Sequence, residues 1–344
     1  MTISNEEKRN FLSGLIEQSS LGVGEARVKR QHDQGKYTAL ERINRLLDPE
    51  SFIEFGKFVK HNCHSFGMEE TQYLGDGVVT GIGTINGQKV AIFSQDFTCW
   101  GGALGKAYAQ KICKIMDFAI ENKVPVIGIN DSGGARIQEG VESLAGYADI
   151  FHRNVKASGV IPQISLVMGP CAGGAVYSPA MTDFVFMVDK TSYMFVTGPD
   201  VVKTVTHEEV TKDELGGAKT HNEKSGVAHF LCEDEDDCLE RVRELLSFLP
   251  SGNFKKAEKT PTLDSNKRKN TKLKDFIPTN SKKPYDMKEL IMDVVDDQHF
   301  LEVQKNFAKN IICGFAQFSG VKVGIIANQP QVLAGCLDLS LIHI

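Results

Sequence analysis

Two short glycine-rich segments hold the residues best suited to chemistry in this sequence. One reads DSGGAR at 131–136, and the other reads CAGGA at 171–175. Each follows a run of apolar residues of the kind that forms a buried strand, so each is predicted to be a tight turn at a strand's end. Glycines leave the backbone N–H groups of such a turn uncovered, and a helix that follows the turn adds its own N-terminal amides.

The arrangement of the two segments predicts an oxyanion hole. Apolar runs at 124–129 and 161–168, each followed by a glycine turn and a helix, are typical of a βαβ unit with parallel neighbouring strands. Turns at one edge of a sheet can aim N–H groups at a single oxygen. The substrate atom expected in this oxyanion hole is a thioester oxygen, which becomes an enolate oxygen when an α-proton leaves. The alternative, that the glycines only make sharp turns, is weakened by their occurrence at two equivalent junctions.

Several common catalytic motifs are missing. The sequence has no G-x-S-x-G elbow, no Walker loop and no H-E-x-x-H. Its eight cysteines form no C-x-x-C pair, and no metal site is predicted. A crotonase-type hydratase or hydrolase would need a placed carboxylate base, and Glu139 is the only candidate for that role near the turns. We therefore expect the base to come from a cofactor or from the substrate.

The elements that must position the turns can be predicted in outline. Residues from about 105 to 121 have the spacing of an amphipathic helix, and Thr38 with Glu41 fits a capping box at the start of another. Asn86 and Gly87 between two apolar runs predict a β-hairpin. The basic residues of 27–45 are interpreted as a solvated helix face, with a phosphate contact as the alternative. The acidic run at 233–237 is interpreted as a solvated turn.

An internal repeat points to duplicated domains. Residues 78–93 align without gaps on residues 311–326, with glycine, lysine, valine and isoleucine at matching positions. In the first copy Gly173 lies 86 residues after Gly87, whereas 24 residues follow Gly320, the match of Gly87 in the second copy. We therefore expect the second copy to stop before its own glycine turns.

These observations predict three parts of the chain: an N-terminal domain at 1–250, a linker at 251–283 and an incomplete C-terminal domain at 284–344. The linker segment has ten Lys or Arg against three acids and few large apolar residues. The last six residues, 339–344, are expected to be a non-native tail, because LSLIHI is what a transposon-based sequencing-adapter end encodes.

Composition and charge limit the class of protein and the cellular location that the sequence predicts. Of 344 residues, 41% are hydrophobic and 24% are charged, and the net charge is −5. These values are typical of an ordinary globular protein and argue against charge-driven binding to nucleic acid. No apolar run is long enough to span a membrane, and the polar N-terminus resembles neither a secretory signal nor a transit peptide. A cytoplasmic location is expected.

Six motifs in order resemble the biotin-dependent acyl-CoA carboxyltransferase family, and its propionyl-CoA carboxylase branch most of all. They are GDGVVTG at 75–81, FSQDF at 93–97, GGALG at 101–105, NDSGGARIQEG at 130–140, GPCAGGAVYSP at 169–179 and TGPD at 197–200. The resemblance extends from about Gly22 to Asp338. It implies an α/β, crotonase-like fold in each of two homologous halves, with the second half cut short here.

The resemblance also implies roles for individual residues. By position, Gly173 and Gly174 would stabilise the thioester enolate, and the turn at Gly133 and Gly134 would border the same catalytic pocket. The neighbouring residues that would contact the cofactor and the coenzyme A substrate are Ala135, Arg136, Ala172 and Ala175. The implied base is the ureido group of biotin after carboxybiotin has released CO₂. The expected reaction converts propionyl-CoA to methylmalonyl-CoA.

The implied partners are a biotin carboxylase, a biotin carboxyl carrier subunit and further full-length copies in a hexamer, with no nucleic acid and no membrane. In this family acyl-CoA would bind mainly to the N-terminal half, and carboxybiotin mainly to the C-terminal half of a neighbouring subunit. Since the second oxyanion turn is expected beyond Asp338, we expect the 344-residue polypeptide by itself to be inactive. Two alternatives remain: the α subunit of a sodium-pumping methylmalonyl-CoA decarboxylase, and a non-catalytic CoA-binding fragment.

Overall fold

The structure is a computed structural model that describes residues 4–21, 23–265, 267–280 and 282–343. Three expectations touch residues outside these ranges. The polar N-terminus includes residues 1–3, the resemblance starts near Gly22, and the unusual tail ends at Ile344; these positions lie outside the described residues.

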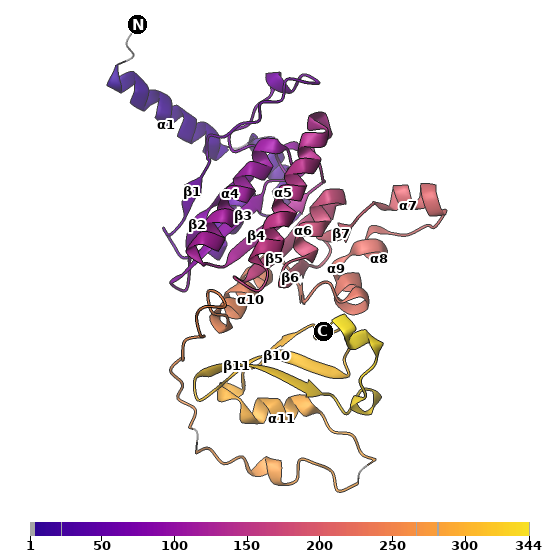
Figure 1. The fold of residues 1–344 in the computed structure, drawn as a ribbon. Coiled ribbons are helices and arrows are strands. Elements are labelled where there is room, and N and C mark those ends of the chain that lie inside the picture. Colours follow the sequence, from indigo (N-terminus) through magenta and orange to yellow (C-terminus); the bar gives the residue numbers. More distant parts are fainter. Residues whose placement is uncertain (1–3, 22, 266, 281, 344) are drawn as a thin grey trace.

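An eight-stranded sheet forms the centre of the larger part of the molecule (Figure 1). Its order is β1 (Ile53–Phe55), β2 (Val78–Ile85), β3 (Gln88–Gln95), β4 (Val126–Ser132), β5 (Gln163–Ala172), β6 (Phe184–Val188) and β8 (Phe230–Cys232), while β7 (Tyr193–Phe195) pairs with the end of β5. The pairs β1–β2 and β2–β3 are antiparallel, and the pairs from β3 onward are parallel. The predicted α/β class, hairpin and parallel strands are confirmed.

Helices cover both faces of this sheet (Figure 1). On one face α4 (Lys106–Asn122) and α5 (Val141–Ala157) pack through a core that includes Tyr108, Ile112 and Tyr147. On the other face α3 (Ala39–Leu46) and α10 (Glu235–Phe248) pack against the alternate strand residues. Strands buried on both faces explain the continuous apolar runs of the sequence. The predicted helix near 105–121 and the capping box of Thr38 and Glu41 are both confirmed.

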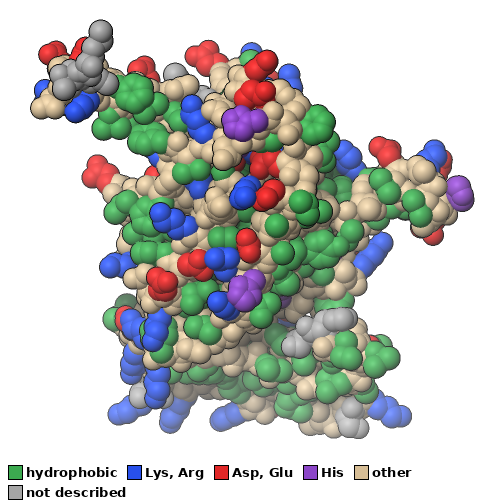
Figure 2. Space-filling model, turned by 45° about the horizontal axis from the view of Figure 1, so that its top comes forward, with side chains coloured by type: hydrophobic (Ala, Val, Ile, Leu, Met, Phe, Trp, Pro, Cys, Tyr) green, Lys and Arg blue, Asp and Glu red, His purple; other side chains and the backbone are tan. Residues whose placement is uncertain are grey.

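The remaining helices lie at the periphery. They are α1 (Asn5–Leu21), α2 (Glu25–Asp33), α6 (Tyr177–Ala180), α7 (Pro199–Thr206), α8 (Lys212–Gly216), α9 (Ala218–Thr220) and α11 (Met287–Val294). Figure 2 shows the arm that carries α7 projecting from the body, and Val201 and Val205 on this helix are exposed. None of the helices in the described ranges is long and apolar enough to cross a membrane.

A second, three-stranded sheet holds the repeated hairpin. Its order is β11 (Val321–Asn328), β10 (Ile311–Phe318) and β9 (Leu301–Val303), and α11 packs on one face. In the first hairpin Gly81 pairs with Ile92, and in the second Gly314 pairs with Ile325. The two hairpins therefore share one register, as the gapless alignment requires.

The repeat extends to the residues that hold each hairpin turn. The carboxylate of Asp48 accepts hydrogen bonds from the amides of Asn86 and Gly87, both at 2.9 Å. The carboxylate of Asp296 accepts them from Ser319 at 2.9 Å and from Gly320 at 2.6 Å. An aspartate after a helix thus clamps the hairpin turn in both copies. This shared clamp supports a duplication beyond the sixteen aligned residues.

The segment between α10 and α11 has little regular structure. Its one helical element in the described residues is a 3₁₀ turn, Thr271–Lys274. Within this stretch the Thr260 amide donates to the carbonyl of Gly320 in the second hairpin turn at 2.8 Å. A linker of this kind agrees with the composition of 251–283, and the domain boundaries stay predictions.

Candidate active site

The two glycine turns lie side by side at the carboxyl ends of β4 and β5. The parallel pairing of these strands ends at Ser132 and Cys171, immediately before the two turns. A β-carbon placed on Gly134 would stand 3.0 Å from the carbonyl oxygen of Ala172. The predicted meeting of the turns at one edge of the sheet is thus confirmed.

The amides of the first turn are already bonded within the fold. The Gly133 N–H donates to the Gly101 carbonyl at 2.9 Å, and the Gly134 N–H donates to the Ser132 hydroxyl oxygen at 3.1 Å. That hydroxyl donates in turn to the Gly102 carbonyl at 2.6 Å. These N–H groups are not available to a ligand in this structure, which corrects the expectation that both turns donate to one oxygen.

The second turn presents free amides. Gly173 and Gly174 open a 3₁₀ helix, Gly173–Val176, and the first N–H groups of a helix have no partner within it. Outside the regular strand and helix ladders of the described residues, neither amide donates a backbone hydrogen bond. Gly173 has a φ of 59°, which favours glycine, and both residues are half-buried. Two adjacent free donors therefore stand at the end of β5.

Tyr147 of α5 fixes the position of this second turn. A β-carbon on Gly174 would lie 2.7 Å from the tyrosine ring, closer than real side chains approach. The ring is 4% exposed and belongs to the core between α5 and the sheet. Only glycine at position 174 lets the turn sit this close to the helix. This role of Tyr147 could not be predicted from the sequence, since nothing in the helical pattern of α5 distinguishes it from an ordinary core residue.

The residues expected to contact the cofactor separate into two groups. Ala135 and Ala172 are half-buried beside the turns and remain compatible with a ligand contact. Arg136 is 1% exposed, and its guanidinium bonds to Asp76 at 2.7 Å and to Glu139 at 2.9 Å. Ala175 is 4% exposed and lies in the core. The side chains of Arg136 and Ala175 are thus enclosed by the fold, and the cofactor contacts of all four residues stay predictions.

Glu139, the one carboxylate considered as a base, is held by neighbours. Its side chain accepts from Arg136 at 2.9 Å and from the Lys106 amide at 2.8 Å. Both of its carboxylate oxygens are therefore already engaged by neighbouring donors. The geometry therefore gives no support to a hydratase or hydrolase that uses Glu139.

A buried charge cluster lies directly beneath the first turn. The Asp131 carboxylate forms ion pairs with Lys36 at 2.6 Å and with Arg42 at 3.0 Å. Arg42 also forms an ion pair with Glu235 at 2.5 Å. Each of these four side chains is at most 4% exposed. Burial opposes the charge on Arg42, but the two carboxylates outweigh it and raise the pKa of its guanidinium.

This cluster corrects two interpretations. Lys36 and Arg42 belong neither to a solvated face nor to a phosphate site, and Glu235 of the acidic run is 3% exposed rather than in a solvated turn. The spacing of α3 contained the signal: Ala39, Arg42, Ile43 and Leu46 recur on one helix face, and all four are buried. Of the residues described, no group of three or more His, Cys, Asp or Glu is placed to hold a metal ion.

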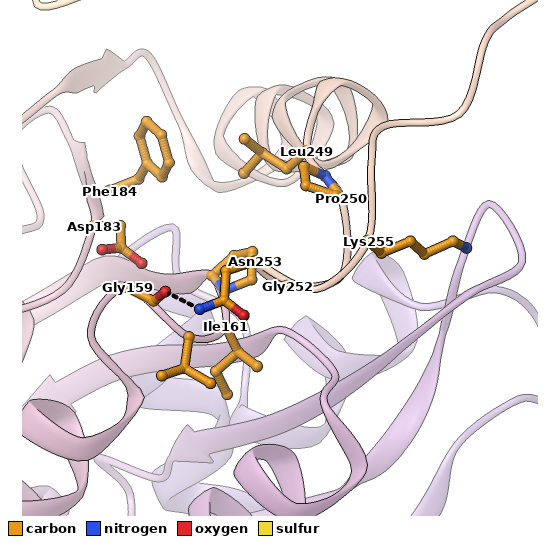
Figure 3. Close-up of a pocket in the computed structure, with 11 residues that line it drawn as sticks. Gly159, Ile161, Asp183, Phe184, Leu249, Pro250, Gly252, Asn253 and Lys255 are labelled. Atoms are coloured by element: carbon orange, nitrogen blue, oxygen red, sulfur yellow. Dashed lines mark hydrogen bonds between the residues drawn. The ribbon is translucent and has the colours of Figure 1, made fainter.

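A separate cavity of about 380 Å³ opens at the opposite end of the sheet (Figure 3). Its walls include Ile161, Asp183 and Phe184 near the starts of β5 and β6, and Leu249 and Pro250 after α10. The Asp183 carboxylate in this wall accepts a hydrogen bond from the Gln163 amide at 2.8 Å, and in Figure 3 Lys255 points away along the rim. The cavity is remote from the carboxyl ends of the strands and is not part of the candidate site.

Comparison with known families gives one extensive match. Residues 30–340 match the model of the carboxyl transferase domain. The chain is 61% identical over 318 residues to a propionyl-CoA carboxylase beta chain of Cereibacter sphaeroides, which covers 92% of this chain and 62% of that protein. It is 55% identical over 335 residues to the methylmalonyl-CoA decarboxylase subunit alpha of Veillonella parvula, covering 97% of this chain and 66% of that protein.

Solved structures agree with these sequence relatives. The crystal structure of transcarboxylase 12S, described as a hexamer assembly with methylmalonyl-coenzyme A and methylmalonic acid bound, superimposes with a TM-score of 0.96 at 47% identity. The match covers 99% of this chain and 66% of that chain. The crotonase-like carboxyltransferase fold is confirmed, and this chain spans about two thirds of the length of the proteins it matches.

Proposed function

Because this chain belongs to the carboxyl transferase family, we propose that it holds the acyl-CoA while a carboxyl group moves from carboxybiotin to the α-carbon of a short acyl-CoA. Propionyl-CoA is the proposed substrate and methylmalonyl-CoA the proposed product. The support for this choice is the 61% identity to a propionyl-CoA carboxylase beta chain. The structural observation that carries the proposal is the pair of free amides at Gly173 and Gly174.

The two amides suit the charge that develops in such a reaction. In the proposed complex the thioester oxygen accepts from the N–H groups of Gly173 and Gly174. Loss of the α-proton turns this oxygen into an enolate oxygen, and the hydrogen bonds to it become charge-assisted and stronger. Stabilisation that grows as the charge develops lowers the barrier rather than merely tightening substrate binding. The turn at Gly133 and Gly134 acts as a wall of the site.

The base is proposed to come from outside the chain. Glu139 is occupied by Arg136 and Lys106, so this side chain does not offer a free carboxylate. Carboxybiotin on a carrier chain would supply both the CO₂ and the base. The proposed partners are therefore a biotin carboxylase, a biotin carboxyl carrier and further copies of the chain. The hexamer of transcarboxylase 12S supports the last of these.

A decarboxylase subunit is the second candidate function. The 55% identity to the Veillonella subunit is close to the identity with the carboxylase chain, and both reactions pass through the same enolate. A turn that stabilises this enolate serves either direction. The direction is testable with a completed chain, by supplying methylmalonyl-CoA and uncarboxylated carrier and measuring propionyl-CoA and carboxylated carrier.

The proposed function predicts activity in a completed chain. A chimera joins this chain to the portion of the Cereibacter relative that follows the matched segment, and it is supplied with carboxylated carrier and propionyl-CoA. We expect the chimera to form methylmalonyl-CoA and the 344-residue polypeptide to form none above background, measured by mass spectrometry. A folded chimera that binds propionyl-CoA but forms no product in either direction would contradict the proposal. Product from the 344-residue polypeptide would contradict the need for a second half.

A further inference from the structure

The His221 side chain connects a serine to the short strand β7. His221 and Ser225 begin and end a π-helical turn, His221–Ser225, which follows α9. The Nε2 atom of His221 lies 2.7 Å from the carbonyl oxygen of Met194 on β7, and its Nδ1 atom lies 2.8 Å from the hydroxyl oxygen of Ser225. Because a carbonyl oxygen can only accept a hydrogen bond, Nε2 carries a proton and donates it to Met194. In the neutral ring Nδ1 then accepts from the Ser225 hydroxyl.

The chain after this turn folds back and holds the histidine in place. The Val227 amide donates to the Ser225 hydroxyl oxygen at 3.3 Å, and the Ala228 amide donates to the His221 carbonyl at 3.1 Å. The Asn222 side chain donates to the Ala228 carbonyl at 2.9 Å. Ser225 is exposed, whereas His221 is half-buried against β7. Both ring nitrogens are therefore engaged, and the fold fixes the orientation of the imidazole.

Strand β7 is only three residues long, and few interactions support it. It pairs in parallel with the last residues of β5, and an isolated bridge joins Tyr193 to Gly217. The end of α8 leaves room for the Met194 carbonyl only because residue 216 is glycine, since a β-carbon there would collide with the carbonyl oxygen. The hydrogen bond from His221 is thus one of a small number of interactions that fix the place of β7.

The place of β7 matters because this strand borders the second glycine turn. Phe195 pairs with Ala172, which immediately precedes Gly173. A β-carbon on Gly173 would lie 4.0 Å from the carbonyl oxygen of Val196, the first residue after β7. The end of β7 therefore runs alongside the backbone that carries the Gly173 amide. A shift of β7 would move that amide with it.

We propose that His221 is a positioning residue for the amides of Gly173 and Gly174. It holds the Met194 carbonyl, and through it β7, in the place that keeps the second turn aligned with the acyl-CoA oxygen. Ser225 acts one step further away, by orienting the ring. This inference rests on the proposed function of the second turn. Neither side chain has to touch the substrate, because their effect reaches it through the pairing of β7 with β5.

Misplaced amides should affect the rate more than substrate binding. An enolate oxygen gains more from the two N–H groups than the neutral thioester oxygen does, because the hydrogen bonds become charge-assisted. A change that only weakens these bonds therefore lowers kcat, while the KM for propionyl-CoA changes little. Loss of a direct contact with the bound substrate would raise KM instead. The two kinetic constants thus separate a positioning role from a substrate contact.

Three substitutions and one control test this role. His221→Ala removes the donor to Met194, whereas His221→Gln keeps a side-chain N–H of similar reach. Ser225→Ala leaves the donor in place but frees the ring. Glu223→Ala is the matched control, because Glu223 is exposed and lies in the same π-helical turn.

The first measurement is kcat and KM for each variant of the completed chain, the chimera with the Cereibacter relative, supplied with propionyl-CoA and carboxylated carrier. We expect His221→Ala to lower kcat by about 10- to 100-fold, somewhat less than the loss of a whole oxyanion donor, and to change KM by less than about threefold. His221→Gln and Glu223→Ala should stay within about threefold of the unsubstituted chimera in kcat, and Ser225→Ala should fall between them and His221→Ala.

The second measurement needs no catalysis. Hydrogen exchange of the 344-residue chain, followed by mass spectrometry, should be faster across residues 193–198 in His221→Ala and unchanged in His221→Gln and Glu223→Ala. An unsubstituted chimera without activity would contradict the proposed function, and the exchange result would then decide the positioning role alone. Three results would overturn that role: unchanged kcat in His221→Ala, equal losses of kcat in His221→Ala and His221→Gln, or unchanged exchange across 193–198 in His221→Ala.

Discussion

Replacing Arg42 with methionine is expected to destabilise the protein by about 3–5 kcal/mol, because removal of one partner leaves buried carboxylates without their charge. Arg42 is fully buried and joins Asp131 to Glu235, at 3.0 Å and 2.5 Å. Lys36 still neutralises Asp131 in the variant, whereas Glu235 loses its only ion pair among the described residues. Urea unfolding followed by circular dichroism measures the change.

Arg45 on the same helix is the matched control. It pairs with Asp236 at 3.2 Å, but the two side chains are 49% and 53% exposed. Arg45→Met is expected to cost about 1 kcal/mol or less, since exposed ion pairs contribute little. The double variant Arg42→Met with Glu235→Leu should recover part of the loss, because it removes the carboxylate that has lost its partner. Equal losses for Arg42→Met and Arg45→Met would refute the assigned role of the cluster.

Gly174→Ala is expected to lower the rate of carboxyl transfer in the completed chain by about 10²–10³-fold, the typical cost of losing one oxyanion donor. The new methyl group would stand 2.7 Å from the Tyr147 ring, which is buried and cannot swing away. The turn must shift instead, and its amides move away from the substrate oxygen. The measurement is kcat for methylmalonyl-CoA formation by the chimera.

A second substitution distinguishes displacement of the turn from general damage. Tyr147→Ala should make room for the methyl group, so the double variant with Gly174→Ala is expected to regain at least about tenfold in kcat over the single variant, as coupled neighbours do. Gly14→Ala is the control, since a β-carbon there meets nothing within 4 Å. Normal kcat in Gly174→Ala would remove the amides of this turn from the mechanism.

Local patterns were enough to predict much of the fold. The capping box of Thr38, the hairpin at Asn86 and the alternation of apolar strands with glycine turns depend on residues within a few positions of one another. Such short-range signals are encoded directly by backbone geometry and apolar spacing. The internal repeat added the second hairpin, whose register agrees with the first.

These local patterns could not predict whether each turn amide is free or already hydrogen-bonded. Whether the Gly133 amide is free depends on the Gly101 carbonyl, which lies thirty-two residues earlier and reaches the turn only after the chain has folded. The burial of Arg42 was not predicted for another reason. Its charge favoured a solvent-exposed position, and the carboxylates of Asp131 and Glu235 that compensate for burial lie far away in sequence. The sequence was enough to propose which residues belong to the site. The hydrogen-bond and ion-pair partners of these residues lie far away in sequence, and they decide what each residue can do.

In the proposed complex Gly173 and Gly174, and not Gly133 and Gly134, donate to the acyl-CoA oxygen. Glycine-selective ¹⁵N labelling of the 344-residue chain tests it directly, with resonances assigned by single substitutions and propionyl-CoA added to saturation. We expect large downfield proton shifts for the Gly173 and Gly174 amides and small ones for Gly133 and Gly134, whose N–H groups already have acceptors. Saturated binding that leaves Gly173 and Gly174 unmoved, or that shifts the first turn instead, would contradict it.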